Sequence, residues 1–210
     1  MKHLSLILFF VIVLASCKKE GNGGCISRVS GVVPVSPADL ASIQTLLNNN
    51  HITANDQVFV VFRSYPGSAD QSSSQYAEST QIRNGLPIFY GDLYYPFTNG
   101  ISQGISGRSY GAISLDNKPA LQVSGLRQLF LNEAVNKQGY NKSFNDSCYQ
   151  AQFGYININL FSADTTVNFV KAWQVHPKNS LFPQCYIRDD NGSTIYFDSG
   201  IRFFAAKEDR

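Results

Sequence analysis

The sequence predicts an α+β protein made of two consecutive units, each an amphipathic helix followed by a meander of antiparallel strands. Two segments carry apolar residues at helical spacing behind residues that favour a helix start. Runs rich in β-branched and aromatic residues follow each of them. Asn-Gly sequences, which are typical of tight hairpin turns, separate several of these runs. We expect the units over residues 34–112 and 113–204, followed by a tail at 205–210.

The first helix has a clear start. Ser36 can cap it, Pro37 suits its first position, and Asp39 lies in the favoured acidic first turn. Its apolar positions share one face: Leu40, Ile43 and Leu47. We expect the helix to end in residues 48–50, and strands to follow at 58–62, 76–83, 86–95 and 101–110, with turns at Asn84-Gly85 and Asn99-Gly100.

The second unit repeats this plan. Ser124 is expected to cap a helix that ends near Gly139. The apolar face of this helix would be Leu126, Leu129, Phe130 and Val135. Strands are expected at 149–160, 167–176, 185–188 and 194–197, with a turn at Asp190-Asn191-Gly192.

The N-terminus indicates export. Lys2 and His3 precede an apolar run at 6–15, which is too short to span a bilayer but suits a signal peptide. Leu14-Ala15-Ser16-Cys17 resembles the lipobox of bacterial lipoproteins. The resemblance implies that 1–16 is removed and that fatty-acyl chains such as palmitate anchor Cys17 to the outer membrane of the cell envelope. Residues 17–33 would be a lipidated tether, and the periplasmic and surface faces remain open alternatives.

Composition fits an exported protein with a real core. The chain has 210 residues, of which 43% are hydrophobic and only 15% charged, with a formal net charge of +2. The sequence has no basic run interleaved with aromatic residues, so it does not predict nucleic-acid binding.

Three cysteines follow Cys17, and an exported compartment permits disulfides. Cys148 and Cys185 both lie in or beside predicted strands, and we expect them to pair. Cys25 would then be a free thiol near the tether. The alternative is that all three are reduced and buried.

A second resemblance concerns the two units. Residues 81–89 resemble the Gln-x-x-x-Gly-hydrophobic-Pro-Ile-Phe signature of the fungalysin/thermolysin propeptide (FTP) domain, and Gly91-Asp92-Leu93 fits its continuation. Asn99-Gly100-Ile101 and Ile105-Ser106-Gly107 are similar to its next hairpin. Residues 172–175 and 186–195 resemble the Trp strand and closing hairpin of a PepSY domain. Tyr90 departs from the FTP pattern, which often has glycine at this position.

The resemblance implies two cystatin-like scaffolds and a role like that of a metallopeptidase prodomain. Its motif positions have scaffold chemistry: glycine permits a tight turn, proline lacks a donor and suits a strand start or edge, and tryptophan can anchor a helix on a sheet. These fold-motif residues are Gly85, Pro87, Gly91, Gly107, Trp173 and Gly192.

Catalytic motifs are missing. The chain has no His-Glu-x-x-His and no Gly-x-Ser-x-Gly sequence, and His51 and His176 are the only histidines after the signal region. We therefore expect no enzyme, catalytic residue, metal or cofactor. The FTP and PepSY resemblance implies a lipid-anchored binding protein that inhibits or chaperones an exported peptidase. The alternative is a surface lipoprotein that binds glycan or peptide.

Overall fold

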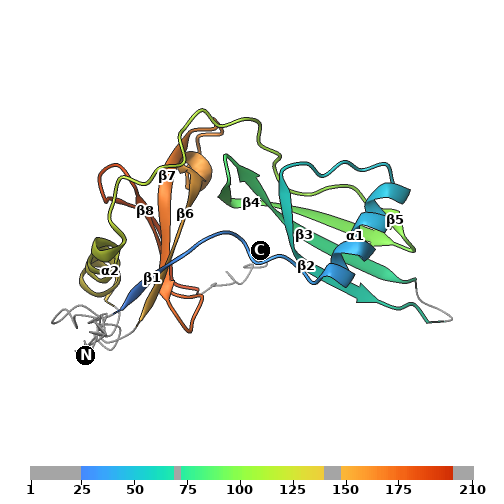
Figure 1. Cartoon of the computed structure of the whole chain (residues 1–210), viewed down its shortest axis with the longest axis horizontal. Coiled ribbons are helices and arrows are strands. Elements are labelled where there is room, and N and C mark those ends of the chain that lie inside the picture. The colour runs from blue at the N-terminus through green and yellow to red at the C-terminus, as the bar shows by residue number, and fades with distance from the viewer. Residues whose placement is uncertain (1–24, 69–71, 140–147, 201–210) are drawn as a thin grey trace, which may run out of the picture.

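The computed structural model describes residues 25–68, 72–139 and 148–200. Within them, nine strands form one mixed β-sheet in the order β2-β3-β4-β6-β7-β8-β9, with β1 paired to β6 and β5 paired to β4. The two α-helices lie at the two outer ends of the molecule (Figure 1). The elements in chain order are β1 (Ile26–Val29), α1 (Pro37–Asn49), β2 (Gln57–Tyr65), β3 (Ser74–Arg83), β4 (Leu86–Thr98), β5 (Ile101–Ser102), α2 (Val123–Leu131), the π-helical η1 (Asn132–Lys137), β6 (Tyr149–Asn157), the 3₁₀-helical η3 (Ile158–Phe161), β7 (Phe169–Pro177), β8 (Gln184–Arg188) and β9 (Thr194–Asp198).

The prediction of two helix-plus-meander, cystatin-like units is wrong. β4 pairs with β3 on one edge, and its residues Ile88 and Phe89 pair in parallel with β6 on the other. The strands of both predicted units therefore belong to one sheet that runs across the expected boundary near residue 112. Turn and periodicity signals are local, and they contain no information about this pairing of strands far apart in the sequence.

A bulge in β4 forms the junction between the two halves of the sheet, β2 to β4 and β6 to β9. The β3–β4 register shifts between Thr80 and Ile82, so residues 88–91 of β4 lie opposite the single residue Gln81. The side-chain amide of Gln81 bridges the bulge by donating to the Gly91 carbonyl at 2.6 Å. An extra stretch of this kind bends a strand, and here it brings β4 to the edge of β6.

Each half of the sheet buries one face under a helix. Ile43 and Leu47 of α1 pack on β2 to β4, which confirms the predicted apolar face of that helix. Ser36 caps α1 by accepting a hydrogen bond from the Asp39 backbone N–H at 3.2 Å. The other helix packs Leu126 and Phe130 into a larger core cluster on β6 to β8.

The C-terminal part of the predicted tether belongs to the fold. Residues 26–29, expected within the 17–33 tether, form β1 and pair in parallel with β6, from Ile26 opposite Tyr149 to Val29 opposite Gln152. A strap of residues 30–35 then crosses toward α1 (Figure 1), where the Val35 N–H donates to the Phe59 carbonyl of β2 at 2.9 Å.

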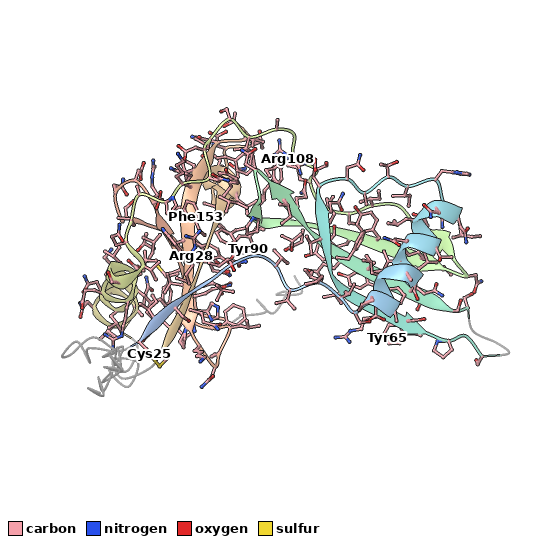
Figure 2. All side chains as sticks on the ribbon, viewed as in Figure 1. Cys25, Arg28, Tyr65, Tyr90, Arg108 and Phe153 are labelled. Atoms are coloured by element: carbon pink, nitrogen blue, oxygen red, sulfur yellow. A yellow bond between two sulfur atoms is a disulfide. The ribbon has the colours of Figure 1, made fainter. Side chains whose placement is uncertain are left out.

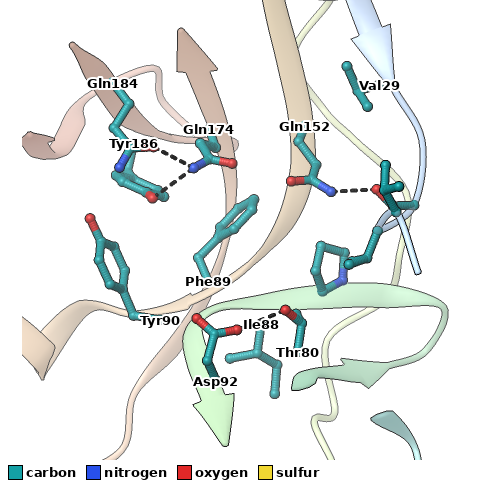
Figure 3. A pocket seen from close by; sticks show the side chains of 14 residues that line it. Val29, Thr80, Ile88, Phe89, Tyr90, Asp92, Gln152, Gln174, Gln184 and Tyr186 are labelled. Atoms are coloured by element: carbon teal, nitrogen blue, oxygen red, sulfur yellow. Dashed lines mark hydrogen bonds between the residues drawn. The ribbon is translucent and has the colours of Figure 1, made fainter. Parts of the chain in front are cut away.

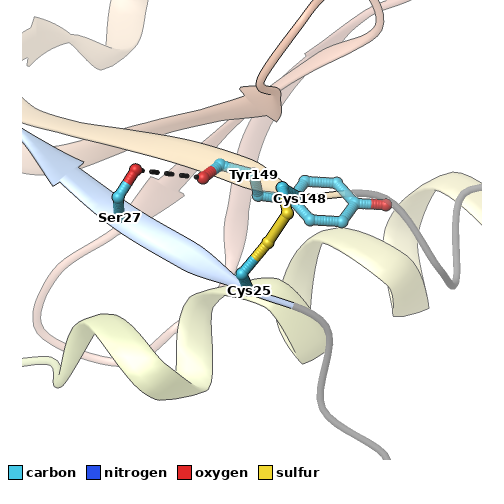
Figure 4. The surroundings of a disulfide bond; sticks show 4 residues. All are labelled: Cys25, Ser27, Cys148 and Tyr149. Carbon is cyan, nitrogen blue, oxygen red and sulfur yellow. Dashed lines mark hydrogen bonds between the residues drawn. A yellow bond between two sulfur atoms is a disulfide. The ribbon is translucent and has the colours of Figure 1, made fainter. Parts of the chain in front are cut away.

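The disulfide prediction is also wrong. Cys25 is bonded to Cys148 (Figure 4). Cys185 is a free, fully buried cysteine. The parallel β1–β6 pairing places Cys25 beside Cys148, with their Cα atoms 4.6 Å apart. Cys185 lies in β8, and β7 separates that strand from β6. Its side chain belongs to the core cluster under α2.

Two further local predictions differ from the structure. The strand expected at 101–110 is reduced to β5, because the chain leaves the sheet through Gly104 and Gly107, both at positive φ. Ser124 lies inside α2, whose N-cap is Gln122.

Candidate functional site

A cleft of about 400 Å³ opens at the junction of the two halves. It lies where the bulge of β4 meets the helix-free face of β6 to β8, and the strap forms one of its walls (Figure 3). Figure 2 shows Tyr90 in the middle of the molecule, between the two helix-covered ends. The lining residues come from β1 (Val29), from the strap (Gly31, Val32, Val33), from β3 and β4 (Thr80, Pro87, Ile88, Phe89, Tyr90, Asp92) and from β6 to β8 (Gln152, Gln174, Gln184, Tyr186).

Three glutamines line the cleft from adjacent strands. Side chains alternate along each strand, so the neighbours of these glutamines, such as Phe153 and Trp173, point to the core under α2. The glutamines therefore lie on the helix-free face, with Gln152 directly opposite Gln174.

Gln174 organises this face. Its Nε2 donates to Gln184 Oε1 at 2.6 Å and to the Tyr186 hydroxyl at 2.9 Å. Gln152 Nε2 donates to the Gly31 carbonyl at 2.7 Å and so holds the strap against the sheet. Among the described residues, no hydrogen bond reaches the Oε1 atoms of Gln152 or Gln174, which leaves two acceptors for a ligand.

Tyr90 forms the aromatic wall. It lies in the bulge with a φ of 57°, a conformation that is rare for a bulky side chain. This is the position where the FTP signature often has glycine, and a positive φ is the conformation that glycine adopts without strain. The Tyr90 ring centroid lies 5.1 to 6.2 Å from those of three other rings: Tyr186, Phe161 and Tyr196. Tyr90 remains 36% exposed and Phe161 41% exposed.

The hydroxyls of Tyr90 and Tyr186 are neutral hydrogen-bonding groups. Burial raises the pKa of Tyr90 to about 12, and the nearby Asp198 carboxylate adds to this increase while a hydrogen bond from Tyr186 opposes it. Burial also raises the pKa of Tyr186, and the neighbouring Tyr90 adds to it. Both side chains therefore stay protonated near neutral pH.

Asp92 is the one charged side chain among the lining residues. Thr80 Oγ1 donates to Asp92 Oδ1 at 2.8 Å. Burial raises the pKa of Asp92, and the hydrogen bond from Thr80 opposes that rise. The cleft thus combines neutral amides, hydroxyls and aromatic rings with a single carboxylate, which disfavours anionic ligands.

The helix-free face of β3 and β4 extends this polar and aromatic surface. Glu78 lies opposite Tyr94 in the register, next to the Thr80–Asp92 pair. The Tyr76 and Tyr94 rings stack with centroids 6.0 Å apart, and the Tyr76 hydroxyl donates to Glu78 at 3.1 Å. Aromatic faces therefore continue beyond the cleft along the sheet.

The predicted motif residues are mainly scaffold, and the structure does not bring them together. Gly85 forms the β3–β4 turn at φ 78°, and Gly192 forms the β8–β9 turn at φ 73°. Gly107 lies at φ 104° against the backbone carbonyl oxygen of Asp92. Trp173 is fully buried and donates from Nε1 to Asp189 Oδ1 at 2.9 Å.

Two motif residues adjoin the cleft. Pro87 lines it, and Gly91 follows Tyr90 in the bulge, where an added Cβ would lie 2.8 Å from Ile88 Cγ2. Sequence reasoning missed Gln152, Gln174 and Gln184. Their signal was a polar residue alternating with apolar ones in each strand, but that pattern is equally typical of a solvent-facing sheet surface.

Cys17, the predicted lipidation residue, lies outside the described residues, as does the tail at 205–210. In the described ranges, no group of three His, Cys, Asp or Glu side chains is arranged to hold a metal ion. None of the helices in these ranges is long and apolar enough to cross a membrane.

Comparison of the chain with protein-family models and with curated proteins gives no match. The cleft itself therefore carries the functional argument.

Proposed function

We propose that the chain is a lipoprotein of the bacterial envelope, anchored through Cys17, whose cleft binds a neutral glycan without transforming it. The observation that carries this proposal is the row of Gln152, Gln174 and Gln184 facing the exposed Tyr90 wall in a cleft with one charge.

The chemistry of the cleft suits sugars. A side-chain amide both donates and accepts hydrogen bonds, so it can engage neighbouring hydroxyl groups of a pyranose. The C–H face of a sugar ring carries a partial positive charge that is attracted to the electron-rich face of an aromatic ring. A volume of about 400 Å³ lies in the range of small-ligand sites.

Isothermal titration calorimetry with the full lipidated chain tests the proposal. The ligands are neutral oligosaccharides of glucose, mannose, galactose, xylose and N-acetylglucosamine, with oligogalacturonate as the anionic comparison. We expect binding of at least one neutral ligand and none of the uronate, because Asp92 repels carboxylates. Failure of the whole neutral panel to bind would contradict the proposal.

Matched variants locate the site. Gln152→Ala should weaken binding roughly tenfold, since a hydrogen bond in a binding site contributes about 0.5–1.5 kcal/mol. Gln150→Ala is the control, because Gln150 lies two residues away in β6 outside the cleft lining. For the aromatic wall, Tyr90→Ala should weaken binding, whereas Tyr65→Ala, at a 59% exposed position of β2, should not. Equal effects within each pair would place binding elsewhere.

The peptidase-directed role that the FTP and PepSY resemblance implies stays a prediction. It is checked by identifying the proteins that co-purify with the anchored chain from native envelopes. A metallopeptidase recovered in stoichiometric amounts would support that role over glycan binding.

A further inference from the structure

We infer that the loop between β7 and β8, residues 178–183, contacts the phospholipid bilayer and sets the orientation of the protein on it. This inference rests on the proposed anchoring through Cys17.

The loop lies at the point where the tether leaves the fold. β7 ends at Pro177, opposite Tyr149 at the start of β6. The Lys178 N–H donates to the Cys148 carbonyl at 2.7 Å. Cys148 is bonded to Cys25, which is the first residue of the predicted tether that the structure describes. The first residue of the loop, Lys178, is therefore hydrogen-bonded to one of the two cysteines of the disulfide, and the tether leads to the other.

The remaining tether is short. Cys25 follows Cys17 by eight positions, because 25 − 17 = 8. Even a fully extended chain of that length spans at most roughly 28 Å. An acylated Cys17 would therefore hold the disulfide end of the sheet near the lipid headgroups and leave α1, at the far end in Figure 1, away from them.

The loop has the side chains that a bilayer interface accepts. Leu181 is 72% exposed and Phe182 is 38% exposed. Lys178 is the only charged residue between 178 and 183. Apolar side chains beside a lysine can enter the acyl boundary while the ammonium group stays among anionic headgroups.

Hydrogen bonds shape the loop before any contact with lipid. The Ser180 N–H donates to the Pro177 carbonyl at 3.1 Å, and the Phe182 N–H donates to Ser180 Oγ at 3.2 Å. His176 Nδ1 lies 2.9 Å from the Ser180 carbonyl oxygen. Leu181 is thus presented outward from a defined turn rather than packed on the sheet.

Fluorescence quenching in vesicles tests the contact. The full lipidated chain is reconstituted in vesicles of phosphatidylethanolamine and phosphatidylglycerol, with and without phosphatidylcholine brominated in its acyl chains. Tryptophan is introduced at the loop as Leu181→Trp, at the strap as Val33→Trp and at β5 as Ile101→Trp. Val33 and Ile101 are matched controls because they are 81% and 65% exposed, and the buried Trp173 is common to all three variants.

We expect a loss of emission with brominated lipid in Leu181→Trp alone. Equal quenching in all three variants, or none in Leu181→Trp while the protein floats with the vesicles, would overturn the contact but not the anchor. A chain that does not float with the vesicles would overturn the anchoring and the contact together, and would leave the glycan proposal to its own titration.

Discussion

Gly154 in β6 lies directly against the carbonyl oxygen of Pro87 in β4: a Cβ atom added at residue 154 would stand 2.6 Å from that oxygen. The same atom would lie 2.8 Å from the Phe89 ring. β4 and β6 pair only over Ile88 and Phe89, so this close approach lies at the contact that joins the two halves in one sheet. Glycine is the residue that permits it.

Gly154→Ala should therefore destabilise the junction. An added methyl group that meets backbone costs about 1–3 kcal/mol in the free energy of unfolding. Urea unfolding followed by tryptophan fluorescence measures this cost. Gly111→Ala is the control, because nothing lies within 4 Å of an added Cβ at that position. If Gly154→Ala and Gly111→Ala unfold at the same urea concentration, the backbones of β4 and β6 are not in close contact at Gly154.

Cys25→Ser should lower the free energy of unfolding by about 4 kcal/mol, because the disulfide closes a long loop in the unfolded chain. The bonded cysteines are 123 residues apart in sequence. Cys185→Ala should cost less, since it removes one small buried side chain. Chemical denaturation under non-reducing conditions compares them.

Alkylation and peptide mapping check the same assignment. Burial raises the pKa of the Cys185 thiol to about 12, although its hydrogen bond with Thr194 opposes the rise. We expect Cys185 to resist alkylation until the protein unfolds, because the thiolate is the reactive form. A mapped Cys148–Cys185 peptide would contradict the structure.

Gln81→Leu should destabilise the fold by about 3 kcal/mol. The fully buried amide donates to the carbonyls of Gly91 and Arg108 and accepts from the Tyr110 N–H. Leucine would leave these three backbone groups unpaired, at roughly 1 kcal/mol or more each. Gln75→Leu, in the same strand, should be neutral or stabilising, because Gln75 Oε1 is buried with no partner among the described residues. Thermal unfolding of both variants measures the contrast.

Asp92→Asn should stabilise the protein at pH 7. The pKa of Asp92 is raised by burial above its usual 3.8, so its charged form is less favourable in the folded state. The stability from this group is fully present below pH 3.8 and is lost as the pH rises through the folded pKa. The asparagine variant should therefore have a higher melting temperature than the wild type at pH values above the folded pKa of Asp92. The two melting temperatures should become equal below pH 3.8.

Asp116→Asn is a control for which we expect a change in stability of the opposite sign. The Lys118 N–H and the Lys171 ammonium group hold the pKa of Asp116 below its usual value. Its stabilising effect is present above pH 3.8 and is lost as the pH falls through the folded pKa. Melting temperatures between pH 3 and 8 should show differences of opposite sign for the two variants. The same sign for both would contradict the assigned environments.

Structural features that depend only on residues close together in the sequence were predictable. The cap at Ser36, the apolar face of α1 and the hairpin turn at Asn84-Gly85 all appear as expected. Trp173 packs in the core cluster with the residues of α2. Each of these depends on backbone preferences or side-chain spacing within a few residues.

The candidate site was not predictable in the same way. The glutamines of the cleft come from three strands, and Tyr90 reaches them only because β4 bulges opposite Gln81. The pairing of Cys25 with Cys148 likewise needs the parallel contact of β1 with β6. A single sequence contains no local mark of such pairings.

The amino-acid sequence by itself determined the helices and most of the strands and turns. Only the tertiary structure decided that the strands form a single sheet, that Cys185 stays reduced, and that amides and aromatic rings face each other in one cleft. The physical reason is that short-range order follows from the conformational preferences of adjacent residues. Long-range pairing depends on where a glycine such as Gly154 lets two distant backbones touch.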